Sequence, residues 1–166
     1  MGTIYYYCII TLPTGGCSSL TSNSAKVTVN QYPVISDFSR LIGSGTSFTV
    51  QPLPVSGKDI VPAGTIYTWS MPEINPINSI SGASAQSNPQ ALISQTLTNN
   101  TKAIATVTYT VHPVSGVCSG AEFKIVVTVN PPINPNTITT DISCYNANDG
   151  SISTNIQGGI PPYIIM

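Results

Sequence analysis

Alternation with a period of two in two long segments is the feature that most limits how this chain can fold. In Ala105–Val111 every second residue is apolar and three threonines lie between them, and in Phe123–Val129 every second residue is again apolar, with Lys124, Val126 and Thr128 between them. A period of two, with β-branched and aromatic residues dominant, is typical of half-buried antiparallel strands. The residues expected to face inward are Ala105, Val107, Tyr109, Val111, Phe123, Ile125, Val127 and Val129.

Shorter segments of the same kind, Ser47–Val50 and Thr65–Trp69, predict further strands with turn-rich stretches between them. The fold class that follows is all-β, built from antiparallel β-sandwiches. Sandwiches commonly bury a tryptophan between their sheets, so Trp69 is interpreted as a core residue together with Tyr109 and Val127. The alternative for Trp69 is an exposed platform on which a sugar ring stacks.

An internal repeat sets the domain organisation. The segments that begin at Tyr5 and at Val107 each contain a Tyr-bearing strand, a Pro/Gly turn, a Cys-Ser step, and a strand that ends Val-Thr-Val-Asn before proline. Asn30 and Asn130 close the two copies 100 positions apart, about the length of one immunoglobulin-like sandwich. The two copies are therefore expected to be the last hairpins of successive sandwich domains.

Three units follow from this repeat. Residues 1–32 are expected to be the C-terminal strands of a truncated immunoglobulin-like domain, and residues 33–131 a complete sandwich. Residues 132–166 are expected to open a third, truncated domain, with Asp149-Gly150 as a tight hairpin turn. Proline stops a strand and stiffens a joint, so Pro131–Pro135 is expected to be a short extended spacer.

Composition excludes several classes of function. Only 7% of the residues are charged and the formal net charge is −1, so nothing attracts phosphate and no nucleic-acid partner is expected. No stretch of about 20 apolar residues is present. Four cysteines and an abundance of Ser, Thr and Asn suit a secreted or cell-surface β-protein. The alternative is a cytosolic β-domain with free thiols.

No constellation of catalytic residues is visible. Acid–base catalysis requires titratable groups that converge, but the single histidine, His112, precedes Pro113 and the six carboxylates are scattered. No nucleophile elbow, zinc spacing or phosphate loop occurs. The sequence therefore predicts a non-enzymatic protein without a cofactor, in which His112 is a surface or turn residue.

The cysteines suggest a disulfide near the N-terminus. Cys8 and Cys17 bracket a Pro/Gly turn, and the facing strands of a hairpin pass within disulfide reach. A Cys8–Cys17 bridge is therefore predicted, with two buried thiols as the alternative. Cys118 matches Cys17 in the repeat but faces no cysteine on its partner strand, so it is either free or bridged to Cys144 across the linker.

One segment partly matches a calcium-binding loop. Asn146, Asn148 and Asp149 supply oxygen ligands at close spacing, but the distant glutamate that completes such a loop is absent. Calcium is therefore only a candidate ligand here, and otherwise no metal site is expected.

Three families resemble successive parts of the chain. Tyr67-Thr68-Trp69, Val107–Val111 and Val127–Pro131 resemble the PKD-like domains of large Bacteroidota surface proteins. The opening segment, with Tyr7–Thr11 and Val27–Asn30, resembles the end of immunoglobulin-like repeats, which often carry the same pair of cysteines.

The third resemblance is the most specific. Cys144, then Asp149-Gly150-Ser151, then Gly158–Tyr163 look like the first half of the SprB repeat, a family named after a mobile gliding adhesin. Pro162 is an extra residue relative to the Gly-Gly-x-Pro-Tyr pattern of that family. If the pattern of the family holds, Cys144 pairs with a cysteine beyond Met166.

The resemblances imply a structural repeat module of a long extracellular adhesin on the outer cell surface, exported by type IX secretion and active in attachment and gliding motility. The implied partners are neighbouring repeats of the same polypeptide, surface polysaccharide or substratum, and the secretion and gliding machinery. The alternative is a noncatalytic spacer or carbohydrate-binding module of a secreted polysaccharide-degrading enzyme or protease.

Overall fold

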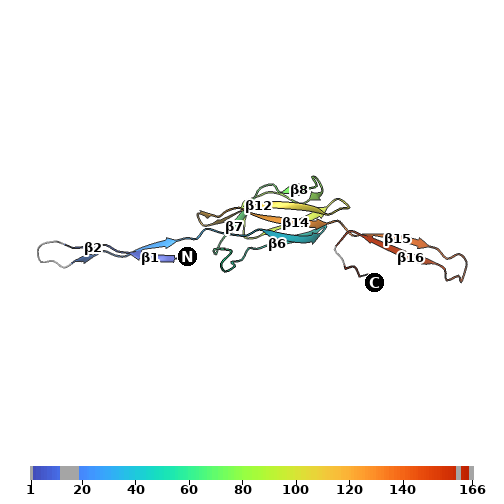
Figure 1. The fold of residues 1–166 in the computed structure, drawn as a ribbon, viewed down its shortest axis with the longest axis horizontal. Helices are drawn as coiled ribbons and strands as arrows, with labels where there is room; N and C mark the ends of the chain where they lie inside the picture. Colours follow the sequence, from blue (N-terminus) through green and yellow to red (C-terminus); the bar gives the residue numbers. More distant parts are fainter. Residues whose placement is uncertain (1, 12–18, 160–161, 165–166) are drawn as a thin grey trace.

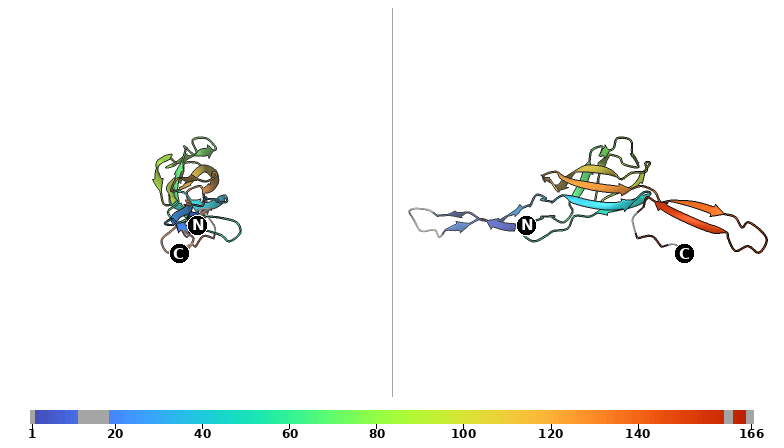
Figure 2. Two further views of the ribbon diagram at one scale, coloured as in Figure 1. Left: turned by 90° about the vertical axis from the view of Figure 1, so that its left-hand side faces the viewer. Right: turned by 45° about the vertical axis from the view of Figure 1, so that its right-hand side comes forward.

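The computed structural model describes residues 2–11, 19–159 and 162–164, and every regular element among them is a β-strand. A two-layer sandwich occupies the middle of the chain, and one hairpin projects from each of its two ends (Figure 1). The right-hand view of Figure 2 shows the same extended arrangement, and the left-hand view looks along the long axis. No helix in the described part of the chain has the length and apolar character that crossing a membrane requires.

The larger sheet of the sandwich has the strand order β10-β7-β12-β14-β5, and β8 and β13 also pair with β12. Its strands are β5 (Phe38–Gly43), β7 (Ile66–Trp69), β8 (Glu73–Asn75), β10 (Gln86–Gln90), β12 (Ala105–Ser115), β13 (Cys118–Ser119) and β14 (Phe123–Asn130). The smaller sheet, β6-β11-β9, contains β6 (Thr46–Val50), β9 (Ile80–Ser81) and β11 (Ile93–Asn99).

The core lies between these two sheets and consists of the residues that alternation directs inward. Along β12 and β14 the buried positions are Ala105, Val107, Tyr109, Val111, Phe123, Ile125, Val127 and Val129. Facing them from the smaller sheet are Phe48, Val50, Ile93 and Leu97. Trp69 is 6% exposed, and its indole ring meets the Tyr109 ring edge to face at a centroid distance of 6.5 Å. Trp69 therefore lies in the core and is no exposed sugar platform.

Two buried polar groups complete the core. The indole Nε1 of Trp69 donates to the carbonyl of Ser84 at 2.9 Å, and the Tyr109 hydroxyl donates to Gln95 Oε1 at 2.8 Å. Burial raises the pKa of both Tyr67 and Tyr109, so both phenols stay neutral. The hydrogen bonds satisfy polar tips that would otherwise be costly to bury.

One pair of strands departs from the expected antiparallel fold. β5 pairs with β14 in parallel, with Phe38 opposite Ile125 and Gly43 opposite Asn130. The predicted all-β sandwich is confirmed, and this pair alone among the described strands is not antiparallel, because the first strand of the sandwich lies beside the last strand and runs in the same direction. The chain consequently enters the sandwich at one end and leaves it at the other (Figure 1).

The N-terminal hairpin pairs β1 (Gly2–Tyr6) with β4 (Ala25–Val29), and beyond it β2 (Ile9–Ile10) with β3 (Leu20–Thr21). It is only two strands wide, so no layer covers either of its faces. Tyr5, Tyr6 and Tyr7 are accordingly 60%, 58% and 63% exposed.

The C-terminal hairpin pairs β15 (Asn134–Thr140) with β16 (Ser151–Gln157). Two expectations are wrong here. The supposed proline spacer already enters a strand at Asn134, and Asp149-Gly150 is not a two-residue turn, because residues 141–150 form a longer connection. The left-handed backbone conformation in this loop belongs to Asn146, at φ 67°, since an asparagine tolerates it better than other residues with side chains. At Gly150 the need is space, because a Cβ there would lie 3.0 Å from Ile142 Cγ2.

Candidate functional site at the joint after the sandwich

Asn99 is a buried polar anchor at the end of the sandwich from which the C-terminal hairpin leaves. Its side chain is 2% exposed, and Nδ2 donates to the carbonyls of Ala103 at 2.8 Å and Val129 at 2.9 Å. Its Oδ1 accepts from the backbone N–H and the hydroxyl of Thr101 at 2.9 and 2.8 Å. One amide therefore connects the loop after β11 to Val129 near the end of β14, next to the point where the chain leaves the sandwich.

Asn130, the last residue of β14, makes the first link across the joint. Its side chain is 8% exposed and Nδ2 donates to the carbonyl of Gly159 at 2.8 Å. The backbone N–H of Gly159 donates in turn to the carbonyl of Pro131 at 2.8 Å. The end of the C-terminal hairpin thus folds back onto the linker that leads into it, and we call these two hydrogen bonds the joint clamp.

The two consecutive glycines are the residues that allow this close approach. Gly158 and Gly159 have φ values of 78° and 69°, and a Cβ on Gly158 would lie 2.1 Å from the carbonyl oxygen of Pro132. A Cβ on Gly159 would lie 2.4 Å from Ile133 Cγ1. Both the backbone conformation and the lack of space therefore exclude a side chain. The Tyr163 hydroxyl donates to the Gly158 carbonyl and holds the segment from its other side.

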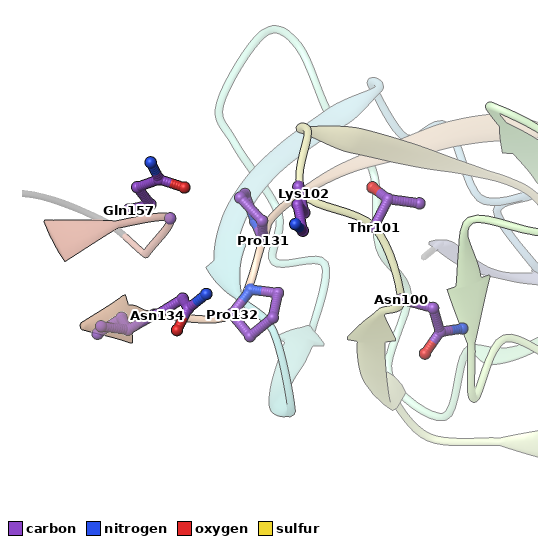
Figure 3. Close-up of a pocket in the computed structure, with 9 residues that line it drawn as sticks. Asn100, Thr101, Lys102, Pro131, Pro132, Asn134 and Gln157 are labelled. Carbon is purple, nitrogen blue, oxygen red and sulfur yellow. The ribbon is translucent and has the colours of Figure 1, made fainter. Parts of the chain in front are cut away.

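A cleft of about 300 Å³ lies beside the clamp (Figure 3). One wall is the loop of Asn100, Thr101 and Lys102, which belongs to the sandwich. The opposite wall consists of Asn134, Gln157 and Gly158 of the hairpin, and Pro131, Pro132 and Ile133 lie between the walls. Lys102 is the single charged residue among those that line the cleft.

The N-terminal joint is built differently. Asn30, which occupies the position of Asn130 in the internal repeat, is exposed. Among the described residues, no hydrogen bond links the β1–β4 hairpin to the sandwich. The chain becomes anchored only at Val34, which exchanges backbone hydrogen bonds with Ile60 at 2.9 and 2.7 Å. The clamp is therefore a property of the C-terminal joint.

The sequence-predicted residues lie in separate parts of the molecule: Trp69, Tyr109 and Val127 in the core, Cys8 in the N-terminal hairpin, and Asn146, Asn148 and Asp149 in the loop 141–150. His112 lies half-buried within β12, opposite Thr68 on β7. Across residues 2–11, 19–159 and 162–164, no group of three or more His, Cys, Asp or Glu side chains converges to hold a metal ion.

The cysteine predictions have different outcomes. Cys17 lies outside the described residues, so the Cys8–Cys17 bridge stays a prediction. Cys8 itself faces Ser22, whose backbone N–H donates to the Cys8 carbonyl at 2.8 Å. Cys118 and Cys144 are not bonded to each other, so the alternative of a bridge across the linker is wrong. Cys118 is held on the sandwich in β13, whereas Cys144 lies in the far loop of the C-terminal hairpin.

The candidate calcium residues lie in the loop 141–150. Asp149 Oδ1 accepts a hydrogen bond from the backbone N–H of Ser143 at 3.0 Å. Hydrogen bonds from the Ser143 side chain and backbone lower the pKa of the exposed Asp149 carboxyl. Asp149 thus organises the loop internally, while Asn146 and Asn148 are exposed beside it. Calcium binding by these three residues stays a prediction.

The clamp residues were missed as a site, although two signals in the sequence could have found them. Asn130 recurs in the internal repeat, and Gly158-Gly159 is one of the few glycine pairs in the chain. Neither signal tells which segment lies against which, because that depends on the path of the whole hairpin.

The fold and the clamp define a class of protein: a β-sandwich module with its entry and exit at opposite ends and a second β-unit attached at the exit. The chain belongs to the PKD-like domain family, whose family model matches residues 40–133. Residues 136–164 match the SprB repeat. No curated protein matches the chain.

Together the two matches support a fragment similar to SprB-like surface adhesins. Both families are typical of extracellular or cell-surface proteins, and both are typically noncatalytic structural modules. The SprB match begins two residues into β15 and includes Gly158 and Gly159, so the glycines of the clamp belong to the repeat.

Proposed function

We propose that this chain is a structural repeat module of a long extracellular adhesin or filament on the bacterial surface, where it serves attachment and gliding motility. The observation that carries the proposal is the parallel pairing of β5 with β14. A module with its entry and exit at opposite ends extends a row of modules in a line. An antiparallel first and last strand would instead return the chain to the end where it entered.

The clamp supports this role, because a stalk that transmits force needs joints of defined geometry. Two hydrogen bonds and two glycines packed against the linker fix the hairpin at the C-terminal joint. The low charge of the chain, with five Lys and Arg and six Asp and Glu, limits nonspecific electrostatic capture. The partners in this role are neighbouring repeats of the same polypeptide, and export proceeds through the type IX secretion system.

Residual dipolar couplings of the labelled 166-residue chain test the mechanical part of the proposal. The couplings of the sandwich and of the β15–β16 hairpin are expected to fit one alignment tensor, because the two units are held in a fixed orientation. The couplings of the β1–β4 hairpin are expected to need a separate tensor. Asn130→Ala removes the side-chain link to Gly159 and is expected to give the C-terminal hairpin a separate tensor. Asn136→Ala, on the exposed part of β15, is the matched control and should keep the common tensor. Separate tensors in the unmodified chain would refute a fixed joint.

A second candidate function is a carbohydrate-binding spacer of a secreted polysaccharide-degrading enzyme or protease. The observation that favours it is the row of Tyr5, Tyr6 and Tyr7, since exposed aromatic rings can stack on sugars. An antibody against the sandwich, applied to intact cells of the source bacterium, separates the two candidates. Surface label that moves along the cell supports a gliding adhesin, and fixed surface label supports attachment alone. Label confined to the medium supports the secreted enzyme.

A further inference from the structure

The cleft at the C-terminal joint has the composition of a ligand site. Its volume of about 300 Å³ lies at the lower end of the range of small-molecule sites, roughly 300–1,000 Å³. Such sites combine an apolar lining with a few placed polar groups. Here Pro131, Pro132 and Ile133 supply the apolar surface, and amide side chains stand on both walls (Figure 3).

The polar groups of the cleft suit hydroxyl groups. Asn134 and Gln157 are directly opposite each other in the β15–β16 ladder, and both carry exposed amide side chains on the hairpin wall of the cleft. Within the described part of the chain, neither side chain is engaged in a hydrogen bond. An amide offers both a donor and an acceptor, and so does a sugar hydroxyl. Hydroxyl groups of one sugar can therefore be met by the two amides, while the C–H face of the sugar ring covers the prolines.

The charge of the cleft selects among sugars. Lys102 projects from the opposite wall, and no carboxylate is among the lining residues to neutralise it. A single lysine in a chain of net charge −1 does not suit a polyphosphate or a nucleic acid, but it complements one carboxylate. We propose that the cleft binds a carboxylate-bearing sugar, the uronate unit of an acidic polysaccharide.

Binding at this position has a mechanical consequence. The two walls belong to different units, since Asn100–Lys102 are part of the sandwich whereas Asn134 and Gln157 are part of the hairpin. A sugar held by both walls adds a third link beside the two hydrogen bonds of the clamp. The site goes beyond the stalk role and does not depend on it, because joint geometry measured without saccharide tests that role by itself.

Titration of the ¹⁵N-labelled 166-residue chain with a trimer of galacturonic acid tests the proposal by NMR. The expected result is saturable shifts of the backbone signals of Lys102, Asn134 and Gln157, and a neutral galactose trimer should bind about tenfold more weakly. Equal binding of the two trimers would overturn the proposal, as would shifts confined to the β1–β4 hairpin. Absence of shifts up to about 10 mM trimer would overturn it as well.

Lys102→Met and Asn134→Ala locate the contacts, and Lys58→Met is the control. Lys102→Met keeps the aliphatic stem and is expected to weaken binding of the acidic trimer about tenfold while leaving the neutral trimer unchanged. Lys58→Met removes an equivalent exposed charge outside the cleft and should change neither affinity. Asn134→Ala should weaken both trimers, because it removes hydroxyl contacts. If acetate alone shifts the same signals at the same concentration, the cleft is a simple anion site and the sugar assignment is wrong.

Discussion

Replacement of Asn99 by alanine is the most informative perturbation of the sandwich, because one buried side chain makes four hydrogen bonds there. Alanine removes the donor to the buried carbonyl of Val129 and to the partly buried carbonyl of Ala103. It also removes the acceptor for Thr101, but water can reach that residue and replace the amide oxygen. The Ala103 carbonyl keeps the hydrogen bond that the Thr101 hydroxyl donates at 2.9 Å, so the expected loss of stability comes mainly from the Val129 carbonyl.

A buried polar group that loses its partner costs about 1–3 kcal/mol, and the Val129 carbonyl is the buried group affected. We expect Asn99→Ala to lower the free energy of unfolding by about 1–3 kcal/mol. A domain of this size loses roughly 4–8 °C of melting temperature per kcal/mol, so the change is easily measured. Asn99→Asp should cost at least as much, because it places a carboxylate against both carbonyls.

Urea unfolding followed by tryptophan fluorescence provides the assay. Trp69 is the single tryptophan and lies in the core, so its signal reports the sandwich and not the two hairpins. Asn100→Ala is the matched control, since this neighbouring side chain is exposed and should change stability by less than about 0.5 kcal/mol. Equal midpoints for the two alanine variants would refute the assignment of Asn99 as a buried anchor.

Three further outcomes are expected. Leu97→Ala, at a fully buried position of the smaller sheet, should destabilise the sandwich by about 2–5 kcal/mol in the same urea assay. Gly82→Ala should destabilise the sandwich by more than an ordinary exposed substitution does, because the φ of Gly82 is +91° and a Cβ there would lie 2.1 Å from the Thr96 carbonyl oxygen. Gly2→Ala is the control, since a Cβ at Gly2 meets open space and should leave stability unchanged. The folded-state pKa of Asp149 is lowered, so its contribution to loop order is complete above the ordinary carboxyl pKa and disappears as pH falls through the lowered value. An NMR titration of the carboxyl group should show this low pKa rising toward normal in Ser143→Ala, and an unchanged pKa in that variant would contradict the assigned cause.

The sequence by itself determined the class of fold and most of the core. Alternation is a local property, because successive side chains of a strand point to opposite faces wherever the strand lies. The segments Ala105–Val111 and Phe123–Val129 could therefore be divided into inward and outward residues before any partner strand was known. The common burial of one tryptophan between the sheets of a sandwich placed Trp69 inside, where the structure has it 6% exposed.

Only the tertiary structure decided which strands are neighbours beyond the two predicted hairpins, and where the candidate site lies. Side chains along β5 alternate with a period of two whether the strand pairs in parallel or antiparallel, so nothing in its own sequence indicates the parallel pairing with β14. Likewise, the pair Gly158-Gly159 indicates that another backbone segment lies close by, but it does not indicate which segment that is. The partner is the linker at Pro131 and Pro132, separated from the glycines by a whole hairpin, and such long-range contacts depend on strand lengths and register that no single segment encodes.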